Sequence, residues 1–282
     1  MRILHLDSGR EMRGGQWQVL RLHRGLIARS HDSRLLARKG SPLGREVPDS
    51  PWRNVDFVHA HDARSHTRAA LFARAPVVVS RRVGFPVRSS ALSRWKYKRP
   101  KLFLAVSEYV AQQLRNAGVE DERIAVVYDG VPVPAELSTG SAILIPATRD
   151  PGKGMALAEQ AARIAGVEVV LSDNLERDLP RAGALLYLTR SEGLGSGILL
   201  AMAYGVAVVA SNVGGIPEII RDGENGLLVE NDANAVAMAL RRLSPELRVS
   251  LGRAARATVM ERFTEAQMVD STIAAYERVL AS

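Results

Sequence analysis

Cysteine is absent from this chain of 282 residues. Neither a disulfide framework nor a thiolate metal site can form without it, and a reducing cytosol is the natural setting. The chain starts directly with a strand-like run, Ile3 to Leu6, and lacks the basic, apolar and small-residue succession of a signal peptide. We therefore expect a cytoplasmic protein that is not exported.

Long apolar runs are also missing. The longest, about residues 197–210, is shorter than the ~20 residues that a membrane-spanning helix needs, and Gly205 interrupts it. There is no H-E-x-x-H motif or carboxylate cluster with metal-ligand spacing, so we expect no metal. Low-complexity tracts and short solenoid repeats are absent too. These absences leave an ordinary globular protein.

Negative charge is scarce in the first half of the chain. Residues 1–140 carry 24 basic and 13 acidic side chains, whereas the remainder carries 14 and 17, so the excess positive charge lies wholly in the first half. An anionic bilayer surface, a phosphate-bearing acceptor or nucleic acid would each suit such a charge. A generally arginine-rich surface without a specific partner explains it equally well.

What is present is enough apolar content, 46%, for two cores, and a repeated alternation of strand-like and helix-like segments. This alternation predicts an α/β fold of two Rossmann-like domains with parallel sheets. In the first half we expect helices at about 16–29 and 108–117 and strands at 2–7, 56–61, 76–81, 102–106 and 124–128.

The pattern restarts after a Pro-, Ser- and Gly-containing stretch at residues 131–141. We therefore expect a first domain at 1–135 and a second at 136–282, with the C-terminal helix able to pack back on the first domain. Strands are expected at 142–145, 167–171, 184–188, 206–210 and 226–229, and the final helices at 233–243, 245–262 and 265–280.

Two glycine-containing turns are candidate phosphate sites. Gly14 and Gly15 lie between the first strand and the first helix, where backbone N–H groups can approach a phosphate, although the full G-x-G-x-x-G pattern is missing and a purely conformational role is the simpler reading. The turn Gly193 to Gly197 is more specific, because Glu192 precedes it and a helix follows. A carboxylate for sugar hydroxyls and amides for a phosphate thus stand together.

The segment 190–229, RSEGLGSGILLAMAYGVAVVASNVGGIPEIIRDGENGLLV, resembles the group 1 glycosyltransferases, also called glycosyltransferase family 4. These are retaining enzymes with two Rossmann-like domains of the GT-B type that face across a cleft. Glu192, Gly214-Gly215, Glu218 and the strand 225–229 fill positions of the family motif. Leu200 stands where the family has a second Glu that binds the donor ribose.

The resemblance extends to SEYVAQQLRNAG and YDGV within residues 107–131 and to ATRDPGKG at 147–154, although the donor domain is contracted. Arg82 stands about where many relatives have a histidine facing the transferred sugar. The resemblance implies catalytic groups at Glu192, Arg149 and Lys153, donor-binding groups at Gly14, Gly15, Gly193, Leu194, Gly195, Ser196, Gly197 and Leu200, and acceptor or phosphate contacts at Arg82 and His61.

Residues 94–101 interleave five cations with Trp95 and Tyr97. This composition suits contact with an anionic membrane, and it would also suit nucleic acid. A solvated helix that buries Trp95 in the core is the structural alternative. Because relatives often act on lipid-linked or cell-envelope acceptors, we favour peripheral contact at the inner face of the membrane and expect no nucleic acid.

The resemblance implies metal-independent transfer of a hexose from a nucleotide-diphosphate sugar, which is a co-substrate rather than a cofactor, to a hydroxyl acceptor in cell-envelope polysaccharide synthesis. Leu200 and Arg82 favour the alternative of a non-catalytic protein of the same fold that binds a nucleotide sugar or the envelope surface. A nucleic-acid-binding module is a further alternative, but it does not explain the motif around Glu192. A sugar-nucleotide epimerase on a similar two-domain scaffold is another, and less of its residue pattern is present here.

Overall fold

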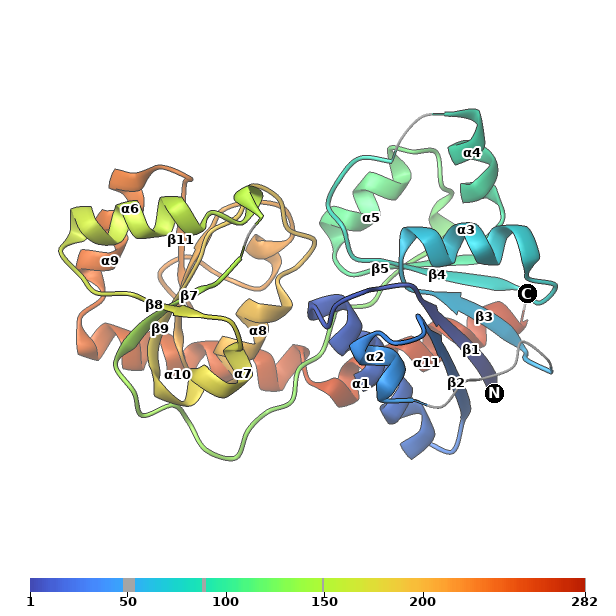
Figure 1. Ribbon diagram of the computed structural model, residues 1–282, viewed down its shortest axis with the longest axis horizontal. Coiled ribbons are helices and arrows are strands. Elements are labelled where there is room, and N and C mark those ends of the chain that lie inside the picture. The colour runs from blue at the N-terminus through green and yellow to red at the C-terminus, as the bar shows by residue number, and fades with distance from the viewer. Residues whose placement is uncertain (48–53, 88–89, 149, 282) are drawn as a thin grey trace. The chain divides into compact units, whose positions relative to one another are not determined.

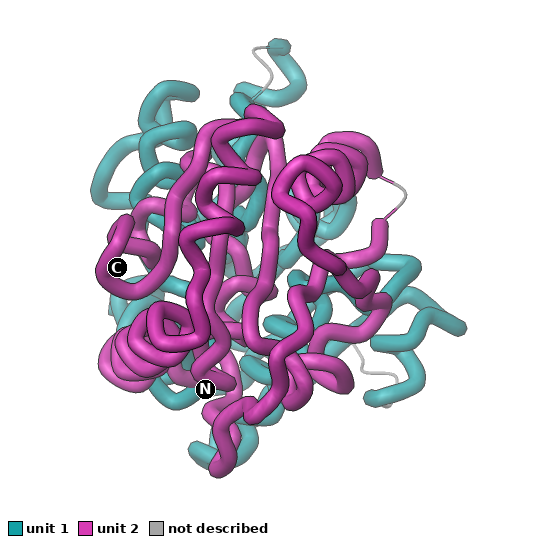
Figure 2. The backbone as a smooth tube through the Cα atoms, turned by 90° about the vertical axis from the view of Figure 1, so that its left-hand side faces the viewer, with its two compact units in different colours: residues 1–130, 265–282 teal, residues 131–264 magenta. Residues whose placement is uncertain are grey.

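The computed structural model describes residues 1–47, 54–87, 90–148 and 150–281. Its contacts divide the chain into two compact units, residues 1–130 with 265–282 and residues 131–264 (Figure 2). The sequence places the change of domain a few residues later, after residue 135. The last helix, which the sequence counts within residues 136–282, is part of the first unit.

The described part of the first unit contains a six-stranded parallel sheet in the order β2-β1-β3-β4-β5-β6 (Figure 1). Helices cover both of its faces. The strands are β1 (Arg2–Asp7), β2 (Asp32–Ala37), β3 (Phe57–Ala60), β4 (Val77–Arg81), β5 (Leu102–Ala105) and β6 (Ile124–Val126). The helices are α1 (Gly14–Ala28), α2 (Pro42–Arg45), α3 (Ala63–Phe72), α4 (Ala91–Lys98), α5 (Glu108–Arg115) and α11 (Glu265–Ala281).

Strand β2 is not among the strands that the sequence predicts. Among the residues that the structure describes, it lies at the edge of the sheet and pairs with β1 alone. Of its six residues only Ser33 and Leu35 are buried. An edge strand needs no continuous apolar run, because one side of its backbone and part of its surface remain in water, so its sequence signal is weak.

Helices α1 and α11 pack together on one face of this sheet, although some 240 residues separate them in the chain. A Cβ atom on Gly25 would lie 2.5 Å from Cγ2 of Val269, so the absence of a side chain at Gly25 permits the close approach. Ion pairs join the same helices, with Arg21 3.0 Å from Glu265 and Arg29 2.7 Å from Asp270. Tyr276 of α11 is fully buried.

The described part of the second unit contains a five-stranded parallel sheet in the order β11-β10-β9-β7-β8. The strands are β7 (Ala142–Pro146), β8 (Val170–Ser172), β9 (Ala182–Tyr187), β10 (Ala207–Ser211) and β11 (Leu227–Val229). The helices are α6 (Met155–Ala165), α7 (Leu175–Asp178), α8 (Ser196–Ala203), α9 (Ala233–Arg242) and α10 (Pro245–Arg262). The predicted α/β fold of two Rossmann-like units is therefore confirmed.

The strand order reverses once in each sheet, between β1 and β3 in the first unit and between β7 and β9 in the second. At such a point the two loops that leave neighbouring strands run in opposite directions and open a crevice at the carboxyl edge of the sheet, which is where open α/β sheets bind ligands. The topology thus marks one candidate site on each unit. None of the described helices is long and apolar enough to cross a membrane.

Candidate active site

At the carboxyl edge of the second sheet, where its strand order reverses, lie Lys153 and Glu192. Lys153 follows β7 at the end of a short 3₁₀ turn, Pro151–Lys153, and Glu192 follows β9. The Nζ atom of Lys153 lies 2.7 Å from Oε2 of Glu192. Their side chains are 37% and 15% exposed, so this ion pair is accessible to a ligand although partly shielded from water.

The turn that carries Lys153 is held by backbone contacts. The carboxylate of Asp150 accepts a hydrogen bond from the Gly152 amide at 2.9 Å, and the carbonyl of Gly152 accepts one from the Arg190 amide at 2.8 Å. Gly154 then has a φ of 62°, and a Cβ atom there would lie 2.7 Å from Leu188. Only glycine fits this conformation at this distance, so the turn has a defined place against the end of β9.

Tyr187, the last residue of β9, also binds Glu192, and the sequence did not single it out. Its hydroxyl donates a hydrogen bond to Oε2 of Glu192 at 2.8 Å. Burial, with the adjacent Glu192 carboxylate, raises the pKa of Tyr187 well above its usual value. The phenol therefore keeps its proton at neutral pH and holds the carboxylate. The Lys153 ammonium lies 5.9 Å from the centre of the same ring.

The glycine pair of the family motif supports the backbone of Glu192. Gly214 has a φ of 61°, and a Cβ atom there would lie 2.0 Å from the carbonyl oxygen of Glu192. The amide of Gly215 donates to that same oxygen at 3.2 Å. The two glycines thus allow the chain after β10 to lie directly against Glu192.

The glycine-rich turn 193–197 leads into α8. Gly193 donates its amide to Oε1 of Glu192 at 3.1 Å. Gly195, at the N-cap, has a φ of 109° and offers no side-chain cap to the first turn of the helix, which begins at Ser196 and Gly197. Uncapped N–H groups at a helix N-terminus carry partial positive charge and suit an anion.

Two predicted donor contacts have little accessible side chain. Leu194 is 2% exposed and Leu200 is 8% exposed. Leu194 therefore contributes to the core and can reach a ligand mainly through its backbone. Leu200 offers no polar atom at the position where the family motif has its second Glu. Arg149 lies outside the described residues.

The remaining predicted contacts belong to the first unit. Gly14 and Gly15 form the first turn of α1 rather than the loop before it, since the N-cap is Arg13. A Cβ atom on Gly15 would meet nothing within 4 Å, so the space beside it is open. The guanidinium of Arg82 forms an ion pair with Asp129, with Nε 3.0 Å from Oδ1.

His61 belongs to a buried group of three imidazoles with His5 and His59. His5 Nδ1 and His61 Nε2 are 2.8 Å apart, and Nη1 of Arg82 lies 3.3 Å from His61 Nδ1. His59 contacts the Tyr276 hydroxyl at 2.6 Å with Nδ1 and Ser80 Oγ at 2.8 Å with Nε2. Their ring nitrogens lie within 4.8 Å of one another, close enough to hold a metal ion.

Burial, with neighbouring charges, lowers the pKa of all three imidazoles well below the usual value, so they are neutral at neutral pH. Of these three, the sequence indicated His61 as a candidate contact and did not indicate His5. The signal for His5 is the register of the sheet, which pairs it with His59 across β1 and β3.

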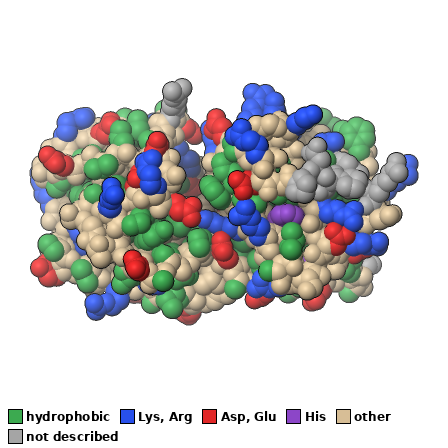
Figure 3. All heavy atoms as spheres, turned by 60° about the horizontal axis from the view of Figure 1, so that its bottom comes forward, with side chains coloured by type: hydrophobic (Ala, Val, Ile, Leu, Met, Phe, Trp, Pro, Cys, Tyr) green, Lys and Arg blue, Asp and Glu red, His purple; other side chains and the backbone are tan. Residues whose placement is uncertain are grey.

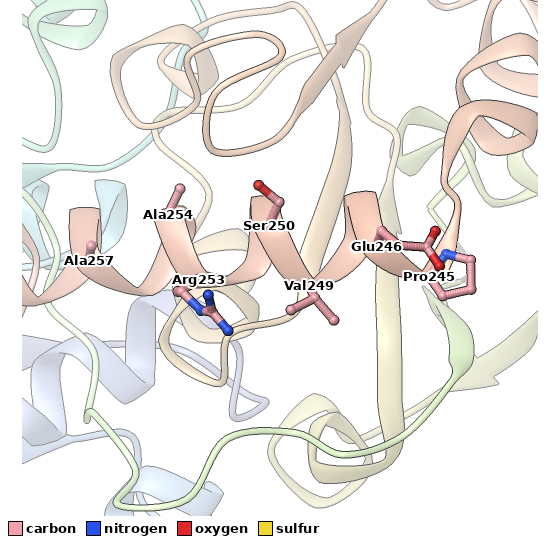
Figure 4. Close-up of a pocket in the computed structure, with 7 residues that line it drawn as sticks. All are labelled: Pro245, Glu246, Val249, Ser250, Arg253, Ala254 and Ala257. Carbon is pink, nitrogen blue, oxygen red and sulfur yellow. The ribbon is translucent and has the colours of Figure 1, made fainter.

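A hollow of about 730 Å³ lies over α10 and has no such polar convergence (Figure 4). Its lining residues, from Pro245 to Ala257, all come from that one helix. Specific ligand sites combine groups from several elements, as the Lys153 and Glu192 crevice does, so we do not assign a ligand to this hollow.

Comparison with known proteins identifies the family and the fold. The family model "Glycosyl transferases group 1" matches residues 152–245, and the model "Glycosyltransferase Family 4" matches residues 51–133. The alpha-maltose-1-phosphate synthase of Mycolicibacterium smegmatis is 40% identical over 99 residues, which are 32% of this chain and 26% of that protein. The N-acetyl-alpha-D-glucosaminyl L-malate synthase of Bacillus anthracis is 37% identical over 111 residues, 38% of this chain and 29% of that protein.

Both alignments thus span less than a third of these curated relatives. Among solved structures, the HepE protein of Anabaena in complex with UDP and glucose superposes with a TM-score of 0.78 and 15% identity, over 98% of this chain and 99% of HepE. At that identity the likeness shows the fold. With a family match in each unit, a GT-B fold and the motif residues placed around Glu192, the chain belongs to the group 1 glycosyltransferases of glycosyltransferase family 4.

Proposed function

We propose that this protein is a retaining glycosyltransferase that moves a hexose from a nucleotide-diphosphate sugar to a hydroxyl acceptor. The observation that carries the proposal is the Lys153–Glu192 ion pair, 2.7 Å long, at the carboxyl edge of the second sheet. The HepE structure, which holds UDP and glucose, supports a donor of this class. The synthase names of the two relatives are consistent with it.

In the proposed site, different groups bind the sugar and the diphosphate of the donor. The Glu192 carboxylate is oriented by the Tyr187 hydroxyl and the Gly193 amide, and it would accept hydrogen bonds from two sugar hydroxyls. The Lys153 ammonium and the first amides of α8 would bind the diphosphate. As the bond from the sugar to the diphosphate breaks, these groups stabilise the negative charge that develops on the leaving phosphate. Arg149 is the expected second cation, and the reaction then needs no metal.

The acceptor is assigned to the first unit, at the carboxyl edge that carries His61 and Arg82. In the proposed retaining reaction the leaving diphosphate takes the acceptor proton on the same face of the sugar. The neutral imidazole of His61 and the guanidinium of Arg82 would contact the acceptor or a phosphate on it. A lipid-linked or cell-envelope acceptor fits this reading.

Peripheral contact with an anionic membrane is the second part of the proposal, and α4 supports it. This helix has no buried residue, and Leu92 and Trp95 are 70% and 41% exposed. The alternative in which Trp95 is buried in the core is therefore wrong. We expect Leu92→Ser with Trp95→Ser to weaken sedimentation with phosphatidylglycerol vesicles. Unchanged sedimentation would contradict the proposed membrane contact.

A non-catalytic nucleotide-sugar-binding protein is the competing function. Leu200 favours it, because an apolar, nearly buried side chain cannot bind a ribose hydroxyl. The ion pair of Arg82 with Asp129 favours it as well, because it leaves the guanidinium partly neutralised. This reading predicts nucleotide-sugar binding without transfer or hydrolysis.

The deciding experiment combines binding and turnover. Nucleoside diphosphates and nucleotide sugars are screened by thermal shift, since a ligand at a hundredfold excess over its Kd stabilises the fold by about 2.7 kcal/mol. Donor consumption is then followed for the wild type and for Lys153→Ala with Glu192→Ala. We expect at least about a hundredfold loss of turnover in this double variant.

Arg221→Ala with Glu224→Ala is the matched control, because it removes an exposed ion pair of 2.6 Å in the same unit. Its turnover should stay close to that of the wild type. Wild-type turnover in the Lys153 and Glu192 variant would overturn the site assignment. Binding without any turnover in the wild type would favour the non-catalytic function.

A further inference from the structure

A second candidate ligand site lies on the first unit, away from the proposed donor and acceptor groups. It shares Lys98, Arg99 and Lys101 with the basic segment 94–101. A pocket of about 520 Å³ is formed where α4 leads into β5, where the chain enters β6, and near the end of α11. These are the places where strands begin. His61, Arg82 and Asp129 follow the ends of strands, so they belong to the opposite edge of the same sheet.

The lining of this pocket is strongly basic. It contains one carboxylate, Glu122, and five cations, which are Lys98, Arg99, Lys101, Arg123 and Arg278. On the face of the molecule in Figure 3, by contrast, Lys and Arg side chains are interspersed with Asp and Glu. Glu122 balances only one of these five positive charges, so the remaining cations repel one another, and a bound anion would relieve that repulsion. Part of the positive excess of residues 1–140 is therefore concentrated here.

The arginines of the pocket are held in place by backbone carbonyl groups. Nη2 of Arg123 lies 2.9 Å from the Tyr97 oxygen, 3.2 Å from that of Lys98 and 2.7 Å from that of Pro100. Nη2 of Arg278 donates to the Glu122 carbonyl at 3.0 Å. Arg123 also has an ion-pair partner, since its Nη1 lies 3.7 Å from Oε2 of Glu120, but the Glu120 side chain is 72% exposed and cancels little of the charge. Carbonyl oxygens fix a guanidinium without cancelling its charge, so these cations are ordered before any ligand arrives.

The two lysines add further positive charge to the pocket. Within the described residues, the ammonium groups of Lys98 and Lys101 have no hydrogen-bond or ion-pair partner. Lysine is a compact point charge with three donors, and fixed arginines beside mobile lysines are a common arrangement for phosphate. A nucleic acid would need an extended basic groove, and this charge is confined to one cavity.

We propose that this pocket binds a phosphate group that carries at least two negative charges, at a site separate from the donor site. The phosphate could belong to a soluble molecule or to a lipid headgroup. A lipid source has local support, since Leu71 and Phe72 at the end of α3 are 56% and 70% exposed. Arg99 of the pocket donates to the carbonyls of Ala70 and Ala73, on either side of these two residues.

The test uses the full chain with Lys98→Glu and Lys101→Glu. The control, Lys39→Glu with Arg45→Glu, changes the net charge by the same amount. Both of its residues are exposed and follow β2, the edge strand far from β5 and β6 in the strand order. Inorganic pyrophosphate is titrated by calorimetry, and sedimentation is measured with phosphatidylcholine vesicles with and without phosphatidic acid. We expect the pocket variant to lose about tenfold or more in affinity for at least one probe, while the control keeps it.

A loss confined to pyrophosphate identifies a soluble phosphate, and a loss confined to phosphatidic acid vesicles identifies a headgroup. Equal binding of both probes by the pocket variant and the control would overturn the proposal. The proposal does not rest on sugar transfer, and the thermal shift with nucleoside diphosphates should be the same in all three proteins. If the wild type showed no thermal shift with nucleoside diphosphates, the proposed donor site would be contradicted. The result for the pocket would not be affected.

Discussion

Tyr187 shows how one residue can organise the candidate active site. Glu192 has two neighbours on the same oxygen, the Lys153 ammonium at 2.7 Å and the Tyr187 hydroxyl at 2.8 Å. If a donor diphosphate draws the lysine away, the tyrosine still fixes the carboxylate. Tyr187 is thus a positioning residue for Glu192 in the proposed site, and its loss should affect binding of the sugar that Glu192 is proposed to hold.

We therefore expect Tyr187→Phe to reduce kcat/KM by about tenfold or more, the range of a hydrogen bond to a charged group. The ring and its contact with Lys153 remain, so affinity for a nucleoside diphosphate that lacks the sugar should hardly change. Steady-state kinetics and calorimetry measure the two quantities. Tyr204→Phe in the same unit is the control, and an equal loss in both variants would contradict the role of Tyr187.

At the residue scale, the sequence could point to candidate site residues that lie together within one short motif. Glu192 and the glycines around it lie within one motif, so their neighbourhood could be read along the chain. Tyr187 and His5 could not be found in that way. Tyr187 lies within an apolar strand, and His5 becomes part of a site only because β1 pairs with β3.

At the scale of elements, strands β1, β3 and β4 and helix α11 meet at the histidine group. Each element supplies a polar side chain to an otherwise apolar layer, namely His5, His59, Ser80 and Tyr276. A buried polar group is tolerated when it has hydrogen-bond partners and is uncharged. The packing of these elements thus depends on the imidazoles staying neutral.

This dependence predicts an acid-sensitive first unit. The folded-state pKa of His5, His59 and His61 lies well below 6.5, so below about pH 6.5 the unfolded chain binds protons that the folded chain does not. Stability is then complete above that pH and falls on acidification, by about 1.4 kcal/mol per pH unit for each histidine. Denaturant unfolding between pH 7.5 and 5 measures the slope.

His5→Asn provides the comparison, because the amide cannot take up a proton in this range. The variant should be less stable at pH 7.5 and should lose less on acidification than the wild type. Parallel pH curves for the two proteins would show that the histidine group does not cause the acid sensitivity.

Elements were predicted well where their apolar pattern was continuous. The central strands β1, β3, β4, β9 and β10 are buried on both faces and have such runs. Strand β2 was missed because an edge position tolerates DSRLLA, in which polar and apolar residues mix. Its place depends on β1 beside it, which no local pattern reveals.

At the scale of the whole molecule, the first unit is made from two separate stretches of chain. Helix α11 adds Met268, Val269, Ala275, Tyr276 and Val279 to a core that also contains Ile3, Leu22 and Phe57. The ring centres of Tyr276 and Phe57 are 4.5 Å apart. The stability of residues 1–130 should therefore depend on a helix that follows the second unit in the chain.

Replacing Tyr276 with Ala tests this dependence. A buried aromatic side chain changed to Ala costs roughly 3–5 kcal/mol. Hydrogen exchange should accelerate in β1, β3 and β5 and remain as in the wild type in β7, β9 and β10. Equal acceleration in both sets of strands would show that the two units do not unfold separately.

The same division bears on how the chain folds as it leaves the ribosome. Domains generally fold in the order of their synthesis, the N-terminal one first. Here residues 131–264 have all been synthesised before α11 is translated. At that stage the preceding 130 residues still lack the apolar side chains that α11 adds to their core. The later unit can thus reach its native state first, and the nascent first unit would expose apolar surface for a chaperone to cover until the last helix emerges.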